Sequence, residues 1–255
     1  MRELRVTIDG KQHTYRVPEN YREMDERQFF VAVLHVMRMI GREAFWERFV
    51  GMRQAFSSKL PEWVWMQMDG MVEYIPRLSE GIDKFLIPSL PCRGKLFLEK
   101  LHAPKPMLDG MSFQQFMAAD NFFSYYCVTQ REQFIDRLVA SLYLRPHETF
   151  VLEERKDVLV PMEKREAYIH HHLSVEVRFA VFVNWIMIKN WLSTIFKHLF
   201  PKGTSNGKPQ ASDWLQIFDS FVGDNIPFIQ EYQKMPCMDA LRIIDGKIKQ
   251  QQTKT

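Results

Sequence analysis

The sequence predicts a mostly α-helical protein with an N-terminal β-hairpin, a main helical domain and a small C-terminal helical module. Residues 5–17 alternate between apolar and polar side chains around Asp9-Gly10, which is the pattern of two strands joined by a tight turn. Most of the remaining chain repeats apolar residues every three to four positions, the spacing of one helix face. A polar run at 201–211, PKGTSNGKPQA, then precedes a last amphipathic stretch.

The first helix is expected after the hairpin, which Pro18 closes. Asp25 is able to cap the free backbone N–H groups of a new helix, and Gln28 stands three residues later, as in a capping box. Apolar residues then recur on one face until Gly41 ends the helix. The residues of this stripe are Phe29, Val33, Val36, Met37 and Ile40.

Residues 42–110 divide into helical and proline-rich parts. A short helix is expected over 42–50, and a longer one between Pro61 and Pro76, because proline is tolerated in the first turn of a helix. Beyond residue 76, prolines leave room only for short extended pieces such as 84–90 and 95–101. This part is therefore either a β-containing excursion or a long ordered loop.

Two helices are expected between residues 112 and 145. Ser112 is placed to cap the first, and the second ends before Pro146, because the residue before a proline disfavours helical geometry. Aromatic and apolar side chains recur along both at helical spacing. The residues that mark their turns are Phe113, Phe116, Met117, Asp120, Phe123, Phe134, Leu138 and Leu142.

The longest expected helix starts after Ser174 and runs to Pro201. Its uncharged run from Phe179 stops at Lys189, whereas a membrane span needs about 20 mainly apolar residues, and a central lysine costs about 2.5–3.5 kcal/mol. An interfacial or a spanning membrane helix is an alternative. The pattern favours a buried core helix, so we expect no transmembrane span.

Residues 212–255 form the expected C-terminal module. Ser212 caps a helix that Gly223 stops, and Pro236 opens the last helix. The module presents more apolar surface than it can enclose, since chains below about 40 residues rarely sustain a core alone. We expect this surface to dock on the main domain or on another copy, and to exchange that contact for a partner helix. The predicted partner-binding residues are Trp214, Phe218, Phe221, Tyr232, Leu241, Ile244 and Ile248.

The predicted domain organisation has three parts. The hairpin and the main helical domain occupy 1–200, a flexible linker occupies 201–211, and the module occupies 212–255. A chain that ends at Pro201 is then expected to stay folded and to lose its partner, and Trp214→Ala and Ile244→Asp are expected to weaken partner capture.

Composition points to a protein that works through packing surfaces. The chain has 20 Phe, 6 Trp and 15 Met among 255 residues, and such side chains supply both buried area and adaptable interfaces. The net charge of +3 gives little attraction to polyanions, so no strong nucleic-acid binding is expected. The three cysteines are widely spaced and odd in number, which favours a reducing compartment. The start, MRELRVTIDGK, lacks the apolar core of a signal peptide, so a cytoplasmic location is expected.

No catalytic, metal or cofactor site is expected. His170, His171 and His172 are consecutive, so on a helix they point about 100° apart and do not share one ion. Cys127 and Cys237 lie on apolar helix faces and are interpreted as small hydrophobic residues. The sequence contains no glycine-rich phosphate loop and no nucleophile-elbow or H-E-x-x-H motif. The aromatic residues are spaced for core packing rather than for stacking on nucleotides.

Three stretches of the chain resemble a known group of proteins. Residues 6–30 resemble the hairpin-then-helix start of small proteins from the structural gene clusters of tailed phages and prophages of Bacteroides-like hosts. The stretches 108–126 and 138–146 are similar to helical segments of the same group. Residues 214–249, with Trp214, Tyr232 and Pro236, resemble the C-terminal helices of phage tail-assembly chaperones.

The resemblance implies a non-enzymatic protein that binds the tape-measure protein during tail assembly in a bacterial cytoplasm. Self-association and a place in the virion are alternatives within this class. A phage protein that handles nucleic acid is a rival from another class, and an enzyme of an unrecognised type is a further one.

Overall fold

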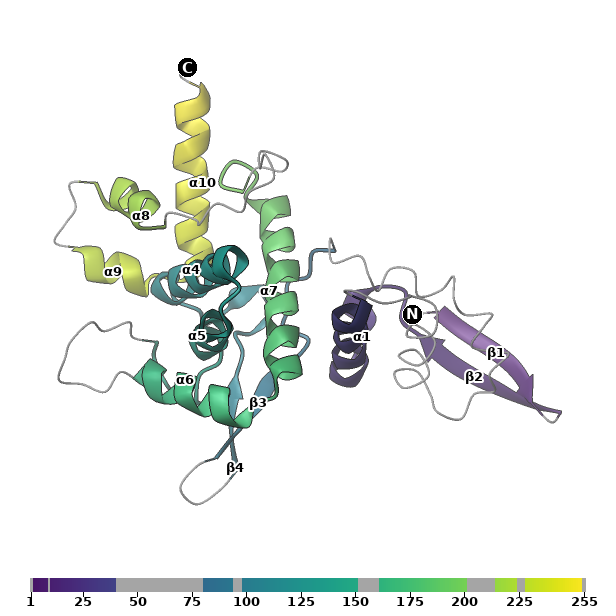
Figure 1. Cartoon of the computed structure of the whole chain (residues 1–255). Helices are drawn as coiled ribbons and strands as arrows, with labels where there is room; N and C mark the ends of the chain where they lie inside the picture. Colours follow the sequence, from purple (N-terminus) through teal and green to yellow (C-terminus); the bar gives the residue numbers. More distant parts are fainter. Residues whose placement is uncertain are drawn as a thin grey trace. The chain divides into compact units, whose positions relative to one another are not determined.

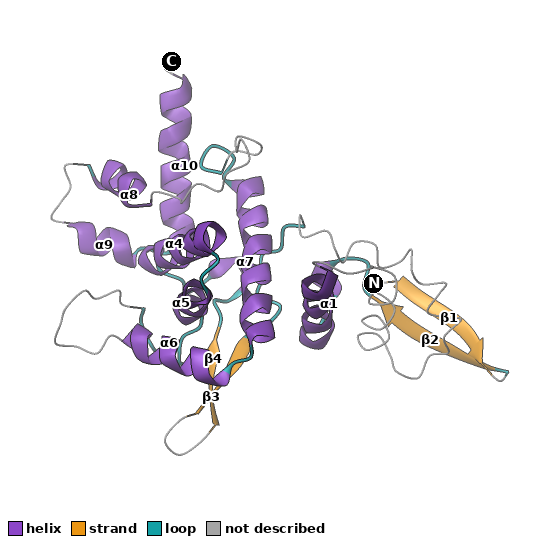
Figure 2. Cartoon of the chain, viewed as in Figure 1, coloured by secondary structure: helices purple, strands orange, loops and turns teal. Residues whose placement is uncertain are grey.

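The computed structural model describes residues 2–8, 10–39, 80–93, 98–150, 161–200, 214–223 and 228–253 (Figure 1). Helices predominate, and the strands of the described part form two hairpins (Figure 2). The predicted mostly α-helical class is therefore confirmed. The chain divides into two compact units, residues 1–82 and residues 83–255.

The first unit begins with the predicted hairpin. Strands β1 (Arg2–Ile8) and β2 (Lys11–Val17) pair antiparallel, with Leu4 opposite Tyr15 and Val6 opposite His13. Gly10 lies in the turn with a φ of 74°, a conformation that glycine adopts without steric cost. The alternation of the sequence thus places Glu3, Arg5 and Thr7 of β1 on one face of the hairpin, where they are exposed.

A 3-10 turn, η1 (Tyr21–Glu23), leads from the hairpin into helix α1 (Glu26–Met39). The predicted capping box is present, because the Gln28 amide N–H donates to Asp25 Oδ1 at 2.8 Å and the Asp25 amide donates to Gln28 Oε1 at 3.0 Å. The amide of Tyr21 donates to Glu80 Oε2 at 3.0 Å. The helices expected over 42–50 and 61–76 lie outside the described residues, as do the side chains of Val36, Met37 and Ile40.

The second unit begins with a second hairpin, so the proline-rich part does contain strands. Strand β3 (Ser89–Arg93) pairs antiparallel with β4 (Leu98–His102), and a 3-10 turn, η3 (Pro106–Leu108), follows. The helices of this unit are α4 (Phe113–Thr129), α5 (Glu132–Leu142), α6 (Pro161–His172), α7 (Val175–Ile195), α8 (Trp214–Val222), α9 (Ile229–Lys234) and α10 (Cys237–Thr253).

Two of these helices start where their caps predict. Ser112 Oγ accepts from the Gln115 amide at 3.2 Å, and Ser174 Oγ accepts from the Val177 amide at 3.5 Å. Helix α7 ends at Ile195 rather than running to Pro201, because the chain enters a turn after Phe196.

Helix α7 is the predicted core helix. A run of its apolar side chains, from Ala180 to Leu192, is almost entirely removed from solvent. None of the helices in the described part combines the length and the apolar character needed to cross a membrane. Buried Asn184 on α7 binds the backbone of residues 84–86, and Tyr143 Oη donates to the Ile87 carbonyl at 2.6 Å.

The structure divides the chain at a different place from the one predicted. We predicted a domain over 1–200 and a separate module over 212–255, but helices α8 to α10 belong to the same compact unit as residues 83–200. Their side chains complete the core around α4, and an isolated β-bridge joins Ser112 to Pro236. The predicted linker, 201–211, lies outside the described residues.

Candidate functional site: the seat of helix α8

The contact between α8 and the rest of its unit is built around a buried carboxylate. Asp120 lies on α4 with none of its surface exposed. Its Oδ2 accepts a hydrogen bond of 2.6 Å from Trp214 Nε1, at the start of α8, and its Oδ1 lies 2.6 Å from Lys189 Nζ on α7. A buried carboxylate is costly unless its charge is paired and its oxygens accept hydrogen bonds. Docking of α8 thus supplies the hydrogen bond that Oδ2 accepts.

Lys189 supplies the opposite charge at this site. Its ammonium group also lies over the ring of Phe123, 4.6 Å from the ring centroid, so one charge contacts both an aromatic face and Asp120. The lysine that interrupts the apolar run of α7 in the sequence therefore has an internal partner. It neutralises Asp120 at one oxygen and leaves the other oxygen to Trp214.

Aromatic rings surround this polar contact. Trp214 meets Phe116 edge to face, with ring centroids 5.1 Å apart, and meets Phe113 in the same way at 5.9 Å. Phe218 and Phe221 of α8 also contact Phe113. Such edge-to-face pairs add to the stabilisation from buried area. We call the residues that receive α8 the α8 seat: Phe113, Phe116, Asp120, Phe200, Tyr232 and Lys247.

Helices α9 and α10 form one side of the seat. The Tyr232 ring lies 5.0 Å from the Phe221 ring, and Lys247 Nζ donates to the Phe221 carbonyl at 3.0 Å while lying over the same ring. Leu241 and Ile244 are buried, and Ile248 is partly buried. All seven predicted partner-binding residues therefore lie in or beside a contact within the chain itself.

Helix α10 is held by the backbone as well as by side chains. The Phe113 amide donates to the Met235 carbonyl at 2.8 Å, and the Cys237 amide donates to the Met111 carbonyl at 2.9 Å. Asp245 Oδ1 accepts from the amides of His198 and Leu199, at 2.9 and 2.8 Å. The hydrogen bonds between α8 and other described elements, in contrast, are donated by the side chains of Trp214 and Lys247.

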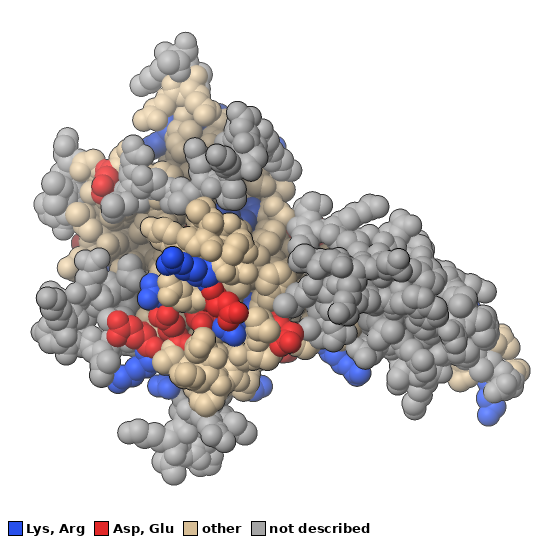
Figure 3. Space-filling model, viewed as in Figure 1, with Lys and Arg blue, Asp and Glu red and all other residues tan. Residues whose placement is uncertain are grey.

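Charges on the visible surface are mixed. On the face drawn in Figure 3, acidic and basic side chains alternate over the described residues and form no continuous patch of one sign. Such a surface provides weak attraction for a polyanion.

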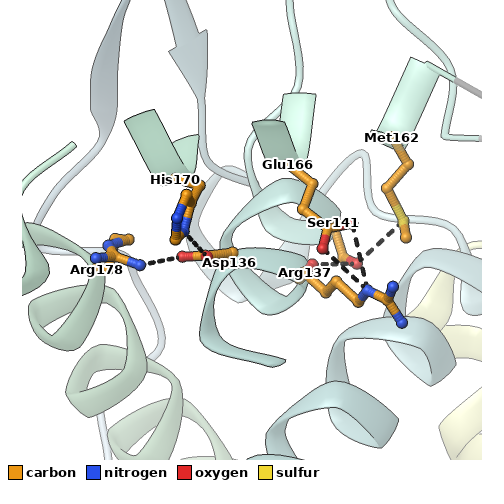
Figure 4. A network of polar contacts seen from close by, with 7 residues as sticks. All are labelled: Asp136, Arg137, Ser141, Met162, Glu166, His170 and Arg178. Atoms are coloured by element: carbon orange, nitrogen blue, oxygen red, sulfur yellow. Dashed lines mark hydrogen bonds and ion pairs between the residues drawn. The ribbon is translucent and has the colours of Figure 1, made fainter. Parts of the chain in front are cut away.

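A second polar network joins helices α5, α6 and α7 (Figure 4). Buried Asp136 binds Arg178 through Oδ1 and His170 Nδ1 through Oδ2, the latter at 2.8 Å. Arg137 pairs with Glu166 on the adjacent helix, at 3.1 Å. The network fixes the three helices against one another, and sequence reasoning did not identify Asp136 or Arg178 as its centre.

In the described part, neither the histidines nor the cysteines are arranged for metal binding or nucleophilic catalysis. Within the described ranges, no group of three His, Cys, Asp or Glu side chains is placed to hold a metal ion. Burial raises the pKa of Cys237 to about 12, and burial also raises the pKa of Cys127. Both thiols therefore stay protonated near neutral pH, and the thiolate is the nucleophilic form. The side chain of Cys92 lies outside the described part.

No family model matches the chain, and no curated protein or solved structure matches it either. The α8 seat is the feature with the most specific geometry in the described part of the second unit.

Proposed function

We propose that the protein binds a helix of a partner protein at the α8 seat, where the partner helix replaces α8. The observation that supports this proposal is that α8 itself docks as a helical ligand does. Its anchors, Trp214, Phe218 and Phe221, follow one another at intervals of four and three residues. Amphipathic helices commonly enter apolar grooves through anchors at this spacing.

Replacement is favoured at α8 rather than at α10 because the two helices are held differently. Helix α10 is held by backbone hydrogen bonds at Met111 and Phe113, whereas among the described residues α8 is held through side chains. Side-chain contacts can be reproduced by another helix of similar chemistry, so a partner can compensate for their loss. The exchange then costs little net free energy.

The resemblance of residues 214–249 to the C-terminal helices of tail-assembly chaperones provides the biological setting. In this proposal the partner is the tape-measure protein of a phage or prophage, and binding takes place in a bacterial cytoplasm. Of the residues that carry the resemblance, Trp214 binds Asp120, Tyr232 contacts the Phe221 ring, and Pro236 forms an isolated β-bridge with Ser112.

A non-catalytic role is supported by the chemistry of the described second unit. The buried acids Asp120 and Asp136 are both paired with basic side chains, and the raised pKa of Cys237 makes its thiol a poor nucleophile. The mixed charge on the face in Figure 3 favours a protein partner over a nucleic acid.

The test is capture of a co-expressed tape-measure protein by full-length variants. Because Trp214 is buried in its own unit, we now expect Trp214→Ala to vacate the seat and to strengthen capture, the reverse of the effect expected from the sequence. The control is Ile243→Ala, which changes an exposed residue of α10 and leaves the seat intact. Weaker capture by Trp214→Ala would mean that the partner contacts α8 itself, and unchanged capture would contradict the exchange.

A further inference from the structure

We infer that Asp120 selects which helix the α8 seat accepts. The seat takes a helix whose first anchor is an aromatic ring that donates a hydrogen bond, with aromatic rings four and seven residues later. This inference rests on the proposed function, because it concerns the same seat. It adds the chemistry that the partner helix must carry.

The requirement for a donor follows from the position of Asp120. Its carboxylate has no exposed surface, and Lys189 approaches Oδ1, so Oδ2 receives its hydrogen bond from Trp214 Nε1. A helix with phenylalanine at this anchor would keep an aromatic ring there, though a smaller one, and would leave Oδ2 without that donor. Hydrogen bonds to charged acceptors are stronger than neutral ones, and leaving such an acceptor buried and unpaired carries the full desolvation penalty.

The requirement for aromatic rings at the later anchors follows from their neighbours. Lys247 Nζ lies 4.9 Å from the centroid of the Phe221 ring, and the Tyr232 ring contacts the same ring edge to face. Phe218 packs on Phe113, with ring centroids 6.1 Å apart. An aliphatic side chain at the last anchor would lose both the cation–π contact and the ring contact.

The same geometry makes α8 an autoinhibitory element. It satisfies Asp120 and covers Phe113 and Phe116 within one chain, so an incoming helix has to compete with it. With an intramolecular competitor, the apparent affinity equals the intrinsic affinity multiplied by the fraction of molecules in which the seat is free. Weakening α8 therefore increases affinity for any helix that fits.

The experiment uses labelled peptides and full-length protein. The probe is a fluorescein-labelled synthetic peptide with the sequence of residues 212–223, SDWLQIFDSFVG. A second peptide carries the change Trp214→Phe, and a control peptide carries Ser220→Ala at a position that is exposed on α8. The acceptors are full-length Trp214→Ala and the double variant Trp214→Ala, Asp120→Asn, each checked for folding by circular dichroism and thermal melting.

Fluorescence anisotropy should show that the Trp peptide binds the Trp214→Ala protein about tenfold more tightly than the Phe peptide does, since a hydrogen bond to a charged group has roughly this effect. With Asp120→Asn the ratio should fall below about threefold, because the acceptor is then neutral. The Ser220→Ala peptide should match the Trp peptide. Wild-type protein, in which α8 competes, should bind every peptide more weakly.

Equal affinities of the Trp and Phe peptides for the Trp214→Ala protein would overturn the selection by Asp120. Failure of both peptides to bind the folded variant would overturn the inference as a whole. If Trp214→Ala does not fold, Trp214→Phe replaces it, because that change keeps an aromatic ring at the anchor and removes the donor.

Capture of the tape-measure protein separates this inference from the proposed function. Capture without any peptide preference leaves the proposed function standing and rejects the role of Asp120. A clear preference without capture supports the seat chemistry and rejects the tape-measure protein as the partner.

Discussion

The side-chain amide of Asn184 on α7 forms a hydrogen bond with the backbone of Leu86, which lies 98 residues earlier in the chain, as a neighbouring strand would. Asn184 Oδ1 accepts from the Leu86 amide at 2.7 Å, and its Nδ2 donates to the Lys84 carbonyl at 3.2 Å. Phe85, which lies between Lys84 and Leu86 in the chain, stacks on Trp185. One buried amide thus holds the segment that leads into β3 against the longest helix.

Replacing Asn184 by Leu should lower the free energy of unfolding by about 2–4 kcal/mol, because it removes two hydrogen bonds and leaves the buried Leu86 amide unpaired. Urea denaturation checks this value. The control is Ile195→Ala at the exposed end of the same helix, which should stay within about 0.5 kcal/mol of wild type. Similar losses for both variants would mean that the Asn184 contact contributes nothing specific.

Trp214→Phe should lower the free energy of unfolding by about 1–3 kcal/mol, because an aromatic ring remains there while the donor to Asp120 is lost. Trp214→Ala should cost more, about 3–5 kcal/mol, because it also removes buried aromatic area. Phe228→Ala is a matched control, since that ring is 49% exposed. Chemical denaturation of the three variants gives the order, and an equal cost for Trp214→Phe and Phe228→Ala would contradict the polar contact.

A chain that ends at Pro201 should not keep the native packing, contrary to the expectation from sequence. It would uncover the rings of Phe113 and Phe116 and remove the donor to Asp120. Increased binding of the dye ANS and a broad, early thermal transition are the expected signs. A chain that ends at Lys249 keeps the seat and should melt nearly as the full chain does. A sharp, native-like transition in the shorter chain would show that α4 does not need α8.

His170→Ala should destabilise the protein more than His171→Ala does. His170 binds buried Asp136, whereas His171 is an exposed neighbour, and one lost hydrogen bond of this kind costs about 0.5–1.5 kcal/mol. Arg178 still pairs with Asp136, which limits the loss. Thermal melting of the two variants provides the comparison. Equal melting temperatures would show that His170 adds nothing to the network.

Cys237 should resist alkylation in the folded protein at pH 8 and react after denaturation, because its pKa is raised to about 12 by burial. Peptide mass spectrometry after iodoacetamide treatment measures this. The unfolded thiol loses its proton near the ordinary value of 9.0, before the folded one does. Its contribution to stability is therefore retained below about pH 9 and lost as the pH rises towards 12. Cys237→Ala should lack this part of the alkaline loss, and reaction of Cys237 in the native state would contradict the burial.

Local features of the fold could be predicted from the sequence. The capping box at Asp25 and Gln28 and the caps at Ser112 and Ser174 depend on residues three positions apart, so a short window contains the whole signal. The apolar face of α8 is covered, as the small size of the C-terminal module predicts. Helix α6 was not predicted, although Pro161 stands at its first position, where proline is favoured.

The long-range features could not be predicted in this way. Asp120 looked like one polar residue on an aromatic helix, and nothing near it in the sequence indicates Lys189 or Trp214 as a partner. The division of the contacts at residue 82 differs from the predicted domain boundaries for a related reason. The composition of 201–211 predicts only how flexible that segment is. The division into units depends on contacts between the residues before it and the residues after it.

The distance in sequence between Asp120 and Trp214 affects how the protein is made. The two residues are separated by 94 positions, so at roughly 5–20 residues per second the ribosome needs about 5–20 s to synthesise the second after the first. During that time the aromatic side chains of α4 lack the cover that α8 provides in the folded protein. The nascent protein therefore exposes aromatic surface in every round of translation. General chaperones of the cell are expected to bind it during this interval.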